Sequence, residues 1–251
     1  MKIALVGSGN VATVLGRLIT KNGHEVIQVI SRDLEHAKIL ADELASSYTD
    51  LSGKADLSAD IFIVAISDKA LEHFFTGSGM GNKLVVHTAG SVSIEVLKNI
   101  SSQYGVLYPL QSLRKEMQLI PPIPFLVDGN NEVAATNIET FAATISGSVK
   151  RAGDDERLKL HAAAVIVSNF TNHLYAIAED FCNKEKVDFD LLKPLILETA
   201  YRIQYASPSE VQTGPAVRKD IITMDKHLRL FAAHPKLRTT YLRLTDSIMN
   251  P

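Results

Sequence analysis

The chain begins Met1-Lys2-Ile3-Ala4-Leu5-Val6-Gly7-Ser8-Gly9-Asn10-Val11-Ala12. The apolar run up to Val6 predicts a buried strand, and apolar residues then recur at helical spacing as far as Ile19. Asn22-Gly23 ends this helix, since glycine adopts the left-handed cap conformation at little cost, and a second apolar run follows at residues 26–30. A strand, the pattern Gly-x-Gly-x-x-Ala, a helix and another strand in this order are typical of a dinucleotide-binding βαβ unit.

The small residues of this pattern each have a physical role. Gly7 allows the tight turn out of the strand, Gly9 lets the backbone approach a pyrophosphate at the helix N-terminus, and Ala12 lets the helix lie close to the strand. We therefore expect six residues to contact the cofactor: Gly7, Ser8, Gly9, Asn10, Val11 and Ala12. The alternative is a glycine-rich turn in an α/β protein that binds no dinucleotide.

The end of the second strand indicates which dinucleotide binds. Proteins that bind NAD usually have an acidic residue here for the ribose 2′-hydroxyl, whereas this chain has Ser31-Arg32. A hydroxyl and a guanidinium suit a 2′-phosphate, because arginine presents a rigid fork of donors, so we expect NADP. Asp33 comes one residue late for the ribose role, and we interpret it as the N-cap of a helix over residues 34–44. The alternative is that Arg32 is an exposed surface charge.

Composition indicates the class of protein. The chain has 251 residues, enough for two domains, and its net charge of -2 gives no general attraction to nucleic acid or anionic membranes. Cys182 is the only cysteine, and no apolar run reaches transmembrane length. The chain begins directly with a strand, which leaves no room for a signal peptide, so we expect a cytoplasmic protein. The histidines and the cysteine lack metal-binding spacing, so we expect no metal.

Strand and helix signals alternate over the first 150 residues or so. Further strands are expected at residues 46–50, 60–66, 84–86, 105–108, 125–127 and 149–151. Helices are expected at residues 69–75, from about 93, and at 133–145, with a flexible loop at Gly77, Gly79 and Gly81. This alternation predicts an α/β fold with a doubly wound, mostly parallel Rossmann sheet.

Strand signals stop at about residue 152. Helices are expected at residues 157–182, 191–205, 220–232 and 235–249. We therefore predict an NADP-binding Rossmann domain over residues 1–152 and an all-α substrate and dimerisation domain over residues 153–251.

Two loops are further candidates for cofactor contacts. Ligands of open α/β sheets lie beyond the carboxyl ends of the strands. The residues that follow two of the predicted strands are Ile66, Ser67 and Asp68, and Thr88, Ala89 and Gly90. Asp68 is alternatively the cap of the next helix.

The long helix over residues 157–182 is the most informative part of the second domain. Residues 162–167 are apolar all round, which predicts burial on most faces and a homodimer formed through this domain. At 100° per residue His161, Ser168, Asn172 and Glu179 fall on one line, with Asn169 beside it. This stripe is either an internal hydrogen-bond network at a subunit interface or a wall that faces the substrate.

Several motifs resemble known families. Val85-Val86-His87-Thr88-Ala89-Gly90 resembles the strand and turn of pyrroline-5-carboxylate reductases and F420-dependent NADP reductases, in the 6-phosphogluconate dehydrogenase-like superfamily. More closely, four stretches resemble Rossmann-like proteins with a DUF2520 C-terminal domain: His87-Thr88-Ala89-Gly90-Ser91, Tyr108-Pro109-Leu110-Gln111-Ser112, His161-Ala162-Ala163-Ala164 with Ser168-Asn169, and Thr213-Gly214-Pro215-Ala216. This resemblance covers nearly the whole chain and implies an NADP-dependent oxidoreductase without an assigned substrate.

Two departures limit what the resemblance implies. β-Hydroxyacid dehydrogenases of the superfamily use a Lys and an Asn one helical turn apart, whereas here Val165 precedes Asn169 by one turn. The helical signature of pyrroline-5-carboxylate reductases is also missing, which argues against proline synthesis.

Hydride transfer between NADP(H) and a small carbonyl or imine substrate is the function that the sequence favours. His161 is the best candidate proton donor, because histidine works as acid or base near neutral pH, and His87 and Tyr108 are its rivals. Three residues are expected to orient the substrate, with Ser168 as a further catalytic candidate: Gln111, Asn169 and Arg218. Arg218 is alternatively a charge in a solvated loop. The alternative function is a non-catalytic NADP-binding sensor or partner-binding module.

Overall fold

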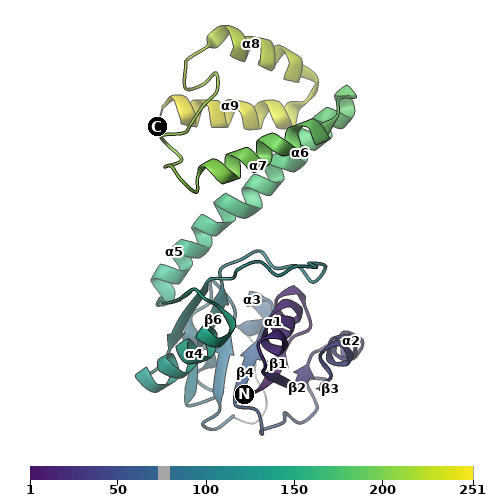
Figure 1. The fold of residues 1–251 in the computed structure, drawn as a ribbon, viewed down its shortest axis with the longest axis vertical. Coiled ribbons are helices and arrows are strands. Elements are labelled where there is room, and N and C mark those ends of the chain that lie inside the picture. The colour runs from purple at the N-terminus through teal and green to yellow at the C-terminus, as the bar shows by residue number, and fades with distance from the viewer. Residues whose placement is uncertain (73–79, 251) are drawn as a thin grey trace. The chain divides into compact units, whose positions relative to one another are not determined.

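The computed structural model describes residues 1–72 and 80–250 (Figure 1). The chain divides into two compact units, Met1–Ile166 and Val167–Pro251. The predicted helix over residues 69–75 lies only partly within the described residues. The loop glycines Gly77 and Gly79 lie outside them. Within the described residues no helix is long and apolar enough to cross a membrane, and no cluster of three or more His, Cys, Asp or Glu side chains can hold a metal ion.

The first unit is built on a sheet that has eight strands among the described residues, in the order β3-β2-β1-β4-β5-β6-β7-β8. The strands are β1 (Lys2–Val6), β2 (Glu25–Ile30), β3 (Ser47–Thr49), β4 (Ile61–Val64), β5 (Leu84–His87), β6 (Gln103–Pro109), β7 (Phe125–Gly129) and β8 (Val149–Arg151). Only the described pair β6 and β7 is antiparallel. The predicted doubly wound, mostly parallel sheet is therefore confirmed.

Alternate residues of β1 explain why both faces of the sheet are covered. Ile3 and Leu5 belong to a core shared with α1 (Asn10–Lys21), α2 (Leu34–Leu44) and α4 (Glu132–Ile145). Ala4 and Val6 point to the other face and belong to a second core. That second core includes Leu71 of α3 (Asp68–Leu71) and Leu97 of the 3-10 helix η1 (Ile94–Leu97).

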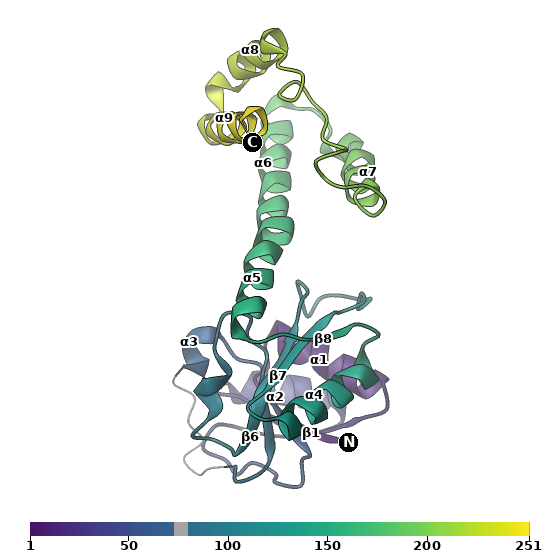
Figure 2. The same cartoon turned by 90° about the vertical axis from the view of Figure 1, so that its left-hand side faces the viewer.

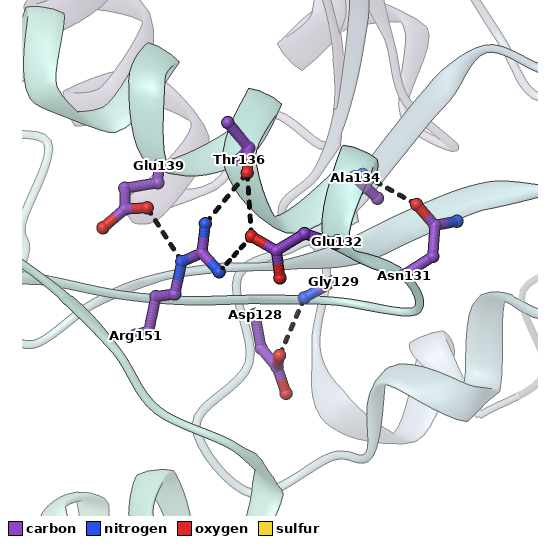
Figure 3. Close-up of polar contacts among 8 residues, drawn as sticks. All are labelled: Asp128, Gly129, Asn131, Glu132, Ala134, Thr136, Glu139 and Arg151. Carbon is purple, nitrogen blue, oxygen red and sulfur yellow. Dashed lines mark hydrogen bonds and ion pairs between the residues drawn. The ribbon is translucent and has the colours of Figure 1, made fainter.

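The edge strand β8 is tied to α4 by one guanidinium (Figure 3). Arg151 donates hydrogen bonds to Glu132 Oε1 at 2.7 Å, Glu139 Oε2 at 2.8 Å and Thr136 Oγ1 at 2.9 Å. Asn131 caps the same helix by accepting from the backbone N–H of Ala134 at 2.9 Å. These contacts hold the last strand of the sheet immediately before the chain enters α5 (Asp154–Ala164).

The second unit is helical. Its elements are α6 (Thr171–Glu185), the 3-10 helix η3 (Phe189–Leu192), α7 (Lys193–Arg202), α8 (Ile221–Leu230), the 3-10 helix η4 (Phe231–Ala233) and α9 (Pro235–Met249). Helices α6 and α9 lie side by side (Figures 1 and 2). Asp220 caps α8 through the N–H of Thr223, and Pro235 opens α9.

The prediction of one uninterrupted α-helix over residues 157–182 is wrong. The helical run begins earlier, at Asp154, and a π-helical segment, η2 (Val165–Phe170), separates α5 from α6. A π-helix bonds residue i to i+5, so each of its turns takes more residues than an α-helical turn. The α-helical line predicted through His161 and Ser168 therefore does not continue across η2.

The prediction that residues 162–167 are buried on most faces is also wrong within this chain. Ile166 is 60% exposed and Val167 is 72% exposed. A helical run that is apolar on all sides indicates that its surface is more stable when buried. It does not indicate whether residues of the same chain or of another chain bury it.

Candidate active site

Gly7 occupies the tight turn between β1 and α1, and only glycine fits there. Its φ is +118°, and a Cβ atom would lie 2.2 Å from the backbone oxygen of Ala65. The N–H of Gly7 also donates to the carbonyl of Ile30 at 2.7 Å. The turn is thus fixed against the carboxyl ends of both neighbouring strands.

The start of α1 is open to an anion. Gly9 is the N-cap residue and supplies no side-chain cap, and a Cβ atom there would meet no atom within 4 Å. The first N–H groups of a helix lack partners within the helix and carry its positive dipole end. Ala12 is fully buried against the sheet, and Val11 packs partly against the same core. Residues 7–12 therefore fit a bound pyrophosphate.

The end of β2 presents a free cation. Ser31 Oγ lies 2.8 Å from Ser8 Oγ, which joins this strand end to the glycine-rich turn. Arg32 is exposed and makes no ion pair or hydrogen bond within the described residues. Asp33 accepts from the N–H of His36 at 3.0 Å, as predicted for an N-cap, and this bond lowers the pKa of its carboxyl. Its cap role leaves Arg32 as the charged group available for a 2′-phosphate.

The loops that follow β4 and β5 are bonded to each other. Ser91 Oγ donates to Asp68 Oδ2, and the N–H of Thr88 donates to the carbonyl of Val64 at 3.2 Å. Asp68 is the first residue of α3, whose N-cap is Ser67 without a side-chain bond, so Asp68 does not act as the cap. The two loops form one edge beyond the carboxyl ends of the strands. This edge also contains Ile66, which packs partly against the second core, and Ala89, which is buried.

His87 is the last residue of β5, directly before the second of these two loops. It has no exposed surface, and its Nδ1 accepts from the backbone N–H of Ala89 at 3.1 Å. Burial and, to a smaller extent, the guanidinium of Arg157 lower the pKa of His87 to about 4. The imidazole is therefore neutral at physiological pH and supports the turn from within.

A tyrosine and a histidine meet at Gly90. Tyr108, near the end of β6, places its hydroxyl 2.8 Å from Nδ1 of His161 in α5. A Cβ atom on Gly90 would lie 2.6 Å from that Nδ1 and 2.9 Å from Cζ of Tyr108. Burial raises the pKa of the Tyr108 hydroxyl, whereas His161 is only partly buried. The predicted donor and one of its two predicted rivals are thus hydrogen-bonded partners.

Arg157 fixes the helix that carries His161. It lies one turn before His161, is 1% exposed, and donates through Nη2 to the carbonyl of Val92 and to Asp154 Oδ1. Asp154 also accepts from the N–H of Ile94 at 3.3 Å. The first turn of α5 is therefore bonded to the loop after β5. Sequence reasoning missed Arg157, because an arginine on a helix gives no sequence signal for complete burial.

Two known families match parts of the chain. Residues 123–248 match the family described as Domain of unknown function (DUF2520). The chain belongs to this family. Residues 2–90 match a second family, described as NADP oxidoreductase coenzyme F420-dependent. None of the curated proteins compared with the chain matches it in sequence.

Solved structures show the same fold over the full length of this DUF2520 chain. A "putative NADP oxidoreductase" from Bacteroides fragilis is 35% identical, with a TM-score of 0.90, and the match covers 100% of this chain and 98% of that chain. A 1-pyrroline-5-carboxylate reductase from Streptococcus pyogenes is 15% identical, with a TM-score of 0.66 over 100% and 99% of the two chains. An imine reductase from Myxococcus stipitatus in complex with NADP+ is 15% identical, with a TM-score of 0.64 over 99% and 92%.

The remaining predicted residues of this DUF2520 protein lie outside the first unit or on its surface. Gln111 follows β6, is exposed, and accepts from the N–H of Ser112 at 2.9 Å. Ser168 and Asn169 lie in the π-helical segment, half-buried and exposed respectively, and Arg218 is exposed in the loop before α8. The structure brings Gly90, Tyr108 and His161 together within the first unit. It assigns Ser168, Asn169 and Arg218 to the second.

Proposed function

We propose that this protein is an NADP-dependent oxidoreductase that transfers a hydride between NADP(H) and a small carbonyl or imine substrate. The observation that carries the proposal is the hydrogen-bonded pair of Tyr108 and His161, which packs against Gly90 in the turn after β5. A proton-donating pair at the carboxyl edge of a dinucleotide-binding sheet is what such a reduction requires.

The cofactor is held by the first βαβ unit. The phosphates bind at the open N-terminus of α1, over Gly7 and Gly9, and the 2′-phosphate binds Ser31 and Arg32. Residues 66–68 and 88–90 would hold the nicotinamide end. Two findings support NADP: the match of residues 2–90 to NADP oxidoreductases, and the description of the Bacteroides fragilis relative.

Arg32 is the residue that we propose selects NADP over NAD, through the 2′-phosphate. We expect Arg32→Glu to weaken NADPH binding by about tenfold or more, because a charge-assisted bond to the 2′-phosphate is replaced by repulsion. NADH lacks that phosphate, so its dissociation constant should hardly change. Titrations followed by nicotinamide fluorescence measure both constants. An equal loss for the two cofactors would mean that Arg32 does not read the 2′-phosphate.

When bound, the cofactor supplies the hydride, and the substrate oxygen or nitrogen then needs a proton. The imidazolium of His161 donates this proton, and its Nδ1–H donates a hydrogen bond to the Tyr108 oxygen. After the transfer His161 is neutral and is reprotonated from water. His87 takes no part in this step, since it is fully buried and its pKa is lowered to about 4.

Tyr108 keeps His161 in one orientation. Because burial raises its pKa, the hydroxyl stays protonated at neutral pH and can pair with the imidazole in either charge state. Gln111, in the same unit as this pair, is the proposed orienting residue there. The orienting roles expected for Asn169 or Arg218, and the catalytic role expected for Ser168, stay predictions from the sequence. The proposed boundary between the two domains is residue 152, directly after the last strand, β8.

Turnover of NADPH distinguishes this function from a non-catalytic sensor. The unaltered protein is mixed with NADPH and a panel of small aldehydes, ketones, keto acids and cyclic imines, and loss of nicotinamide absorbance is recorded. We expect at least one substrate class to be reduced. Tight NADPH binding without oxidation of NADPH across the whole panel would favour a sensor or partner-binding module.

We also propose a homodimer formed through the helical domain. Large apolar side chains are exposed on neighbouring helical elements, including Val167 at 72%, Phe170 at 58% and Leu174 at 36%. Such a face is stabilised when a second copy covers it. Light scattering after size exclusion should give about twice the 27.4 kDa of one chain, and Phe170→Glu should reduce this mass toward the monomer. A monomer at micromolar concentration in the unaltered protein would exclude the dimer.

A cytoplasmic location completes the proposal. Cys182 is the only cysteine of the chain, so no disulfide joins two positions within it. A reducing compartment is compatible with this cysteine usage and supplies NADPH.

A further inference from the structure

The segment between β6 and β7 crosses the carboxyl edge of the sheet toward α1 (Figure 1). We call residues 110–124 the arm. Its base is closed by the N–H of Leu110, which donates to the carbonyl of Pro124 at 2.8 Å. Leu113 and Ile123 are buried in the core that α1 shares with the sheet. The arm is therefore anchored to the dinucleotide-binding half of the unit.

Both backbone polar groups of Lys115 in the arm are bonded to side chains of α1. Its N–H donates to Oδ1 of Asn10 at 3.2 Å, and its carbonyl accepts from Nη1 of Arg17 at 2.5 Å. Arg17 is held in turn by Glu43, through Nε at 2.5 Å and Nη2 at 3.1 Å. Asn10 is the first residue of α1, so these bonds fix Lys115 beside the open end of that helix.

The ammonium group of Lys115 has no partner at hydrogen-bond or ion-pair distance among the described residues, although it interacts electrostatically with the carboxylate of Glu116. The Lys115 side chain is exposed and makes no hydrogen bond or ion pair within residues 1–72 and 80–250. The neighbouring cation, Arg114, is paired with Glu116 at 3.5 Å. The space around Gly9 at the start of the same helix is open, as described above. The backbone of a lysine whose ammonium group makes no hydrogen bond or ion pair in the described part of the chain is thus held next to the first N–H groups of α1.

We propose that Lys115 binds the pyrophosphate of the dinucleotide, opposite the N-terminus of α1. The proposal rests on the function proposed above, and it gives the Asn10 side chain a different role from the one expected from the sequence. Asn10 positions Lys115 through its backbone N–H. Lysine acts as a point charge on phosphate, while the helix supplies N–H donors from the other side.

The test compares two cofactors that share the pyrophosphate. We expect Lys115→Met to raise the dissociation constants of NADPH and NADH by the same factor, about tenfold. Arg32→Glu should weaken the binding of NADPH alone. The roles of Lys115 and Arg32 can therefore be distinguished by whether NADH binding is also weakened. The matched control is Lys98→Met, which removes another exposed, unpaired lysine of the same unit and should change neither constant.

A double-mutant cycle tests the role of Asn10. Asn10→Ala should weaken both cofactors in the unaltered protein and add little in the Lys115→Met background, because the amide acts through the lysine. Equal effects of Asn10→Ala in the two backgrounds would overturn this positioning role. If Lys115→Met leaves both constants unchanged while Arg32→Glu weakens NADPH, the inference fails and the proposed function stands. If the unaltered protein binds neither cofactor, both fail.

Discussion

The variant His161→Gln should lose turnover while it keeps its affinity for NADPH. The expected fall in kcat is about a hundredfold to ten-thousandfold, the range that a positioned general acid contributes. Glutamine retains polarity and approximate size, but it has no proton to give near neutral pH. The proposed phosphate site lies around Gly9 and Arg32, on other elements of the same unit, so the dissociation constant should stay within about twofold.

Two further variants make this result specific. Tyr108→Phe keeps the ring beside Gly90 and removes the hydroxyl that lies 2.8 Å from His161, so it should lower kcat less than His161→Gln does. His173→Gln changes an exposed histidine in α6 and should leave kcat unchanged. Full turnover in His161→Gln would remove His161 from the mechanism. In that case Tyr108 would be the donor to examine, since its hydroxyl lies 2.8 Å from His161 beside Gly90.

The second large effect is expected from substitutions of Gly7 and Gly9 in the turn after β1. One substitution should abolish cofactor binding, and the other should destabilise the fold. Gly9→Val should fold normally, because a Cβ atom there meets nothing within 4 Å, and the backbone φ of -86° suits any residue. Its branched side chain would occupy the space that the pyrophosphate needs. NADPH binding should therefore fall below what a titration in the micromolar range detects, with an unchanged melting temperature.

Gly7→Ala should instead destabilise the fold. The new Cβ atom would lie 2.2 Å from the backbone oxygen of Ala65, and φ at this residue is +118°. A strained backbone of this kind costs about 1–3 kcal/mol, before the clash with Ala65 is relieved. Thermal unfolding followed by circular dichroism should show a lower melting temperature for Gly7→Ala than for the unaltered protein.

Normal NADPH binding by Gly9→Val would contradict the first of these two predictions. It would place the cofactor somewhere other than the start of α1.

Local chemistry made many of the helices and strands predictable from the sequence. The α2 helix spans Leu34–Leu44 as predicted, because Asp33 caps it and a continuous helical pattern follows. Pro235 likewise marks the start of α9. The buried strands were found because their apolar runs are short and bounded by Gly, Ser or Asp. These features depend on residues that are close together in the sequence, so they can be recognised from the sequence alone.

The contacts that build the site depend on the topology of the fold, so they were harder to predict from the sequence. Tyr108 and His161 were named separately, but their hydrogen bond joins residues 53 positions apart and needs the order of the strands. The bond from Lys115 to Asn10 spans 105 positions and has no local signal. The antiparallel pairing of β6 with β7 is equally invisible in the apolar pattern, which is the same for both directions.

The long helix shows where periodicity fails. A stripe computed at 100° per residue assumes α-helical geometry throughout, and the π-helical segment Val165–Phe170 breaks that assumption. Such segments occur frequently at functional sites, and this one contains Ser168 and Asn169. Burial was misjudged for the same residues, because apolar composition does not state whether the covering surface comes from this chain.

Titration of the unaltered protein with NADPH and with NADH tests the central claim most directly. Calorimetry or nicotinamide fluorescence gives both dissociation constants in one series. Micromolar binding of NADPH, with much weaker binding of NADH, is the result that the open helix N-terminus and the free Arg32 predict. Binding of neither cofactor would contradict the proposed cofactor site and, with it, the assignment of this protein as an NADP-dependent oxidoreductase.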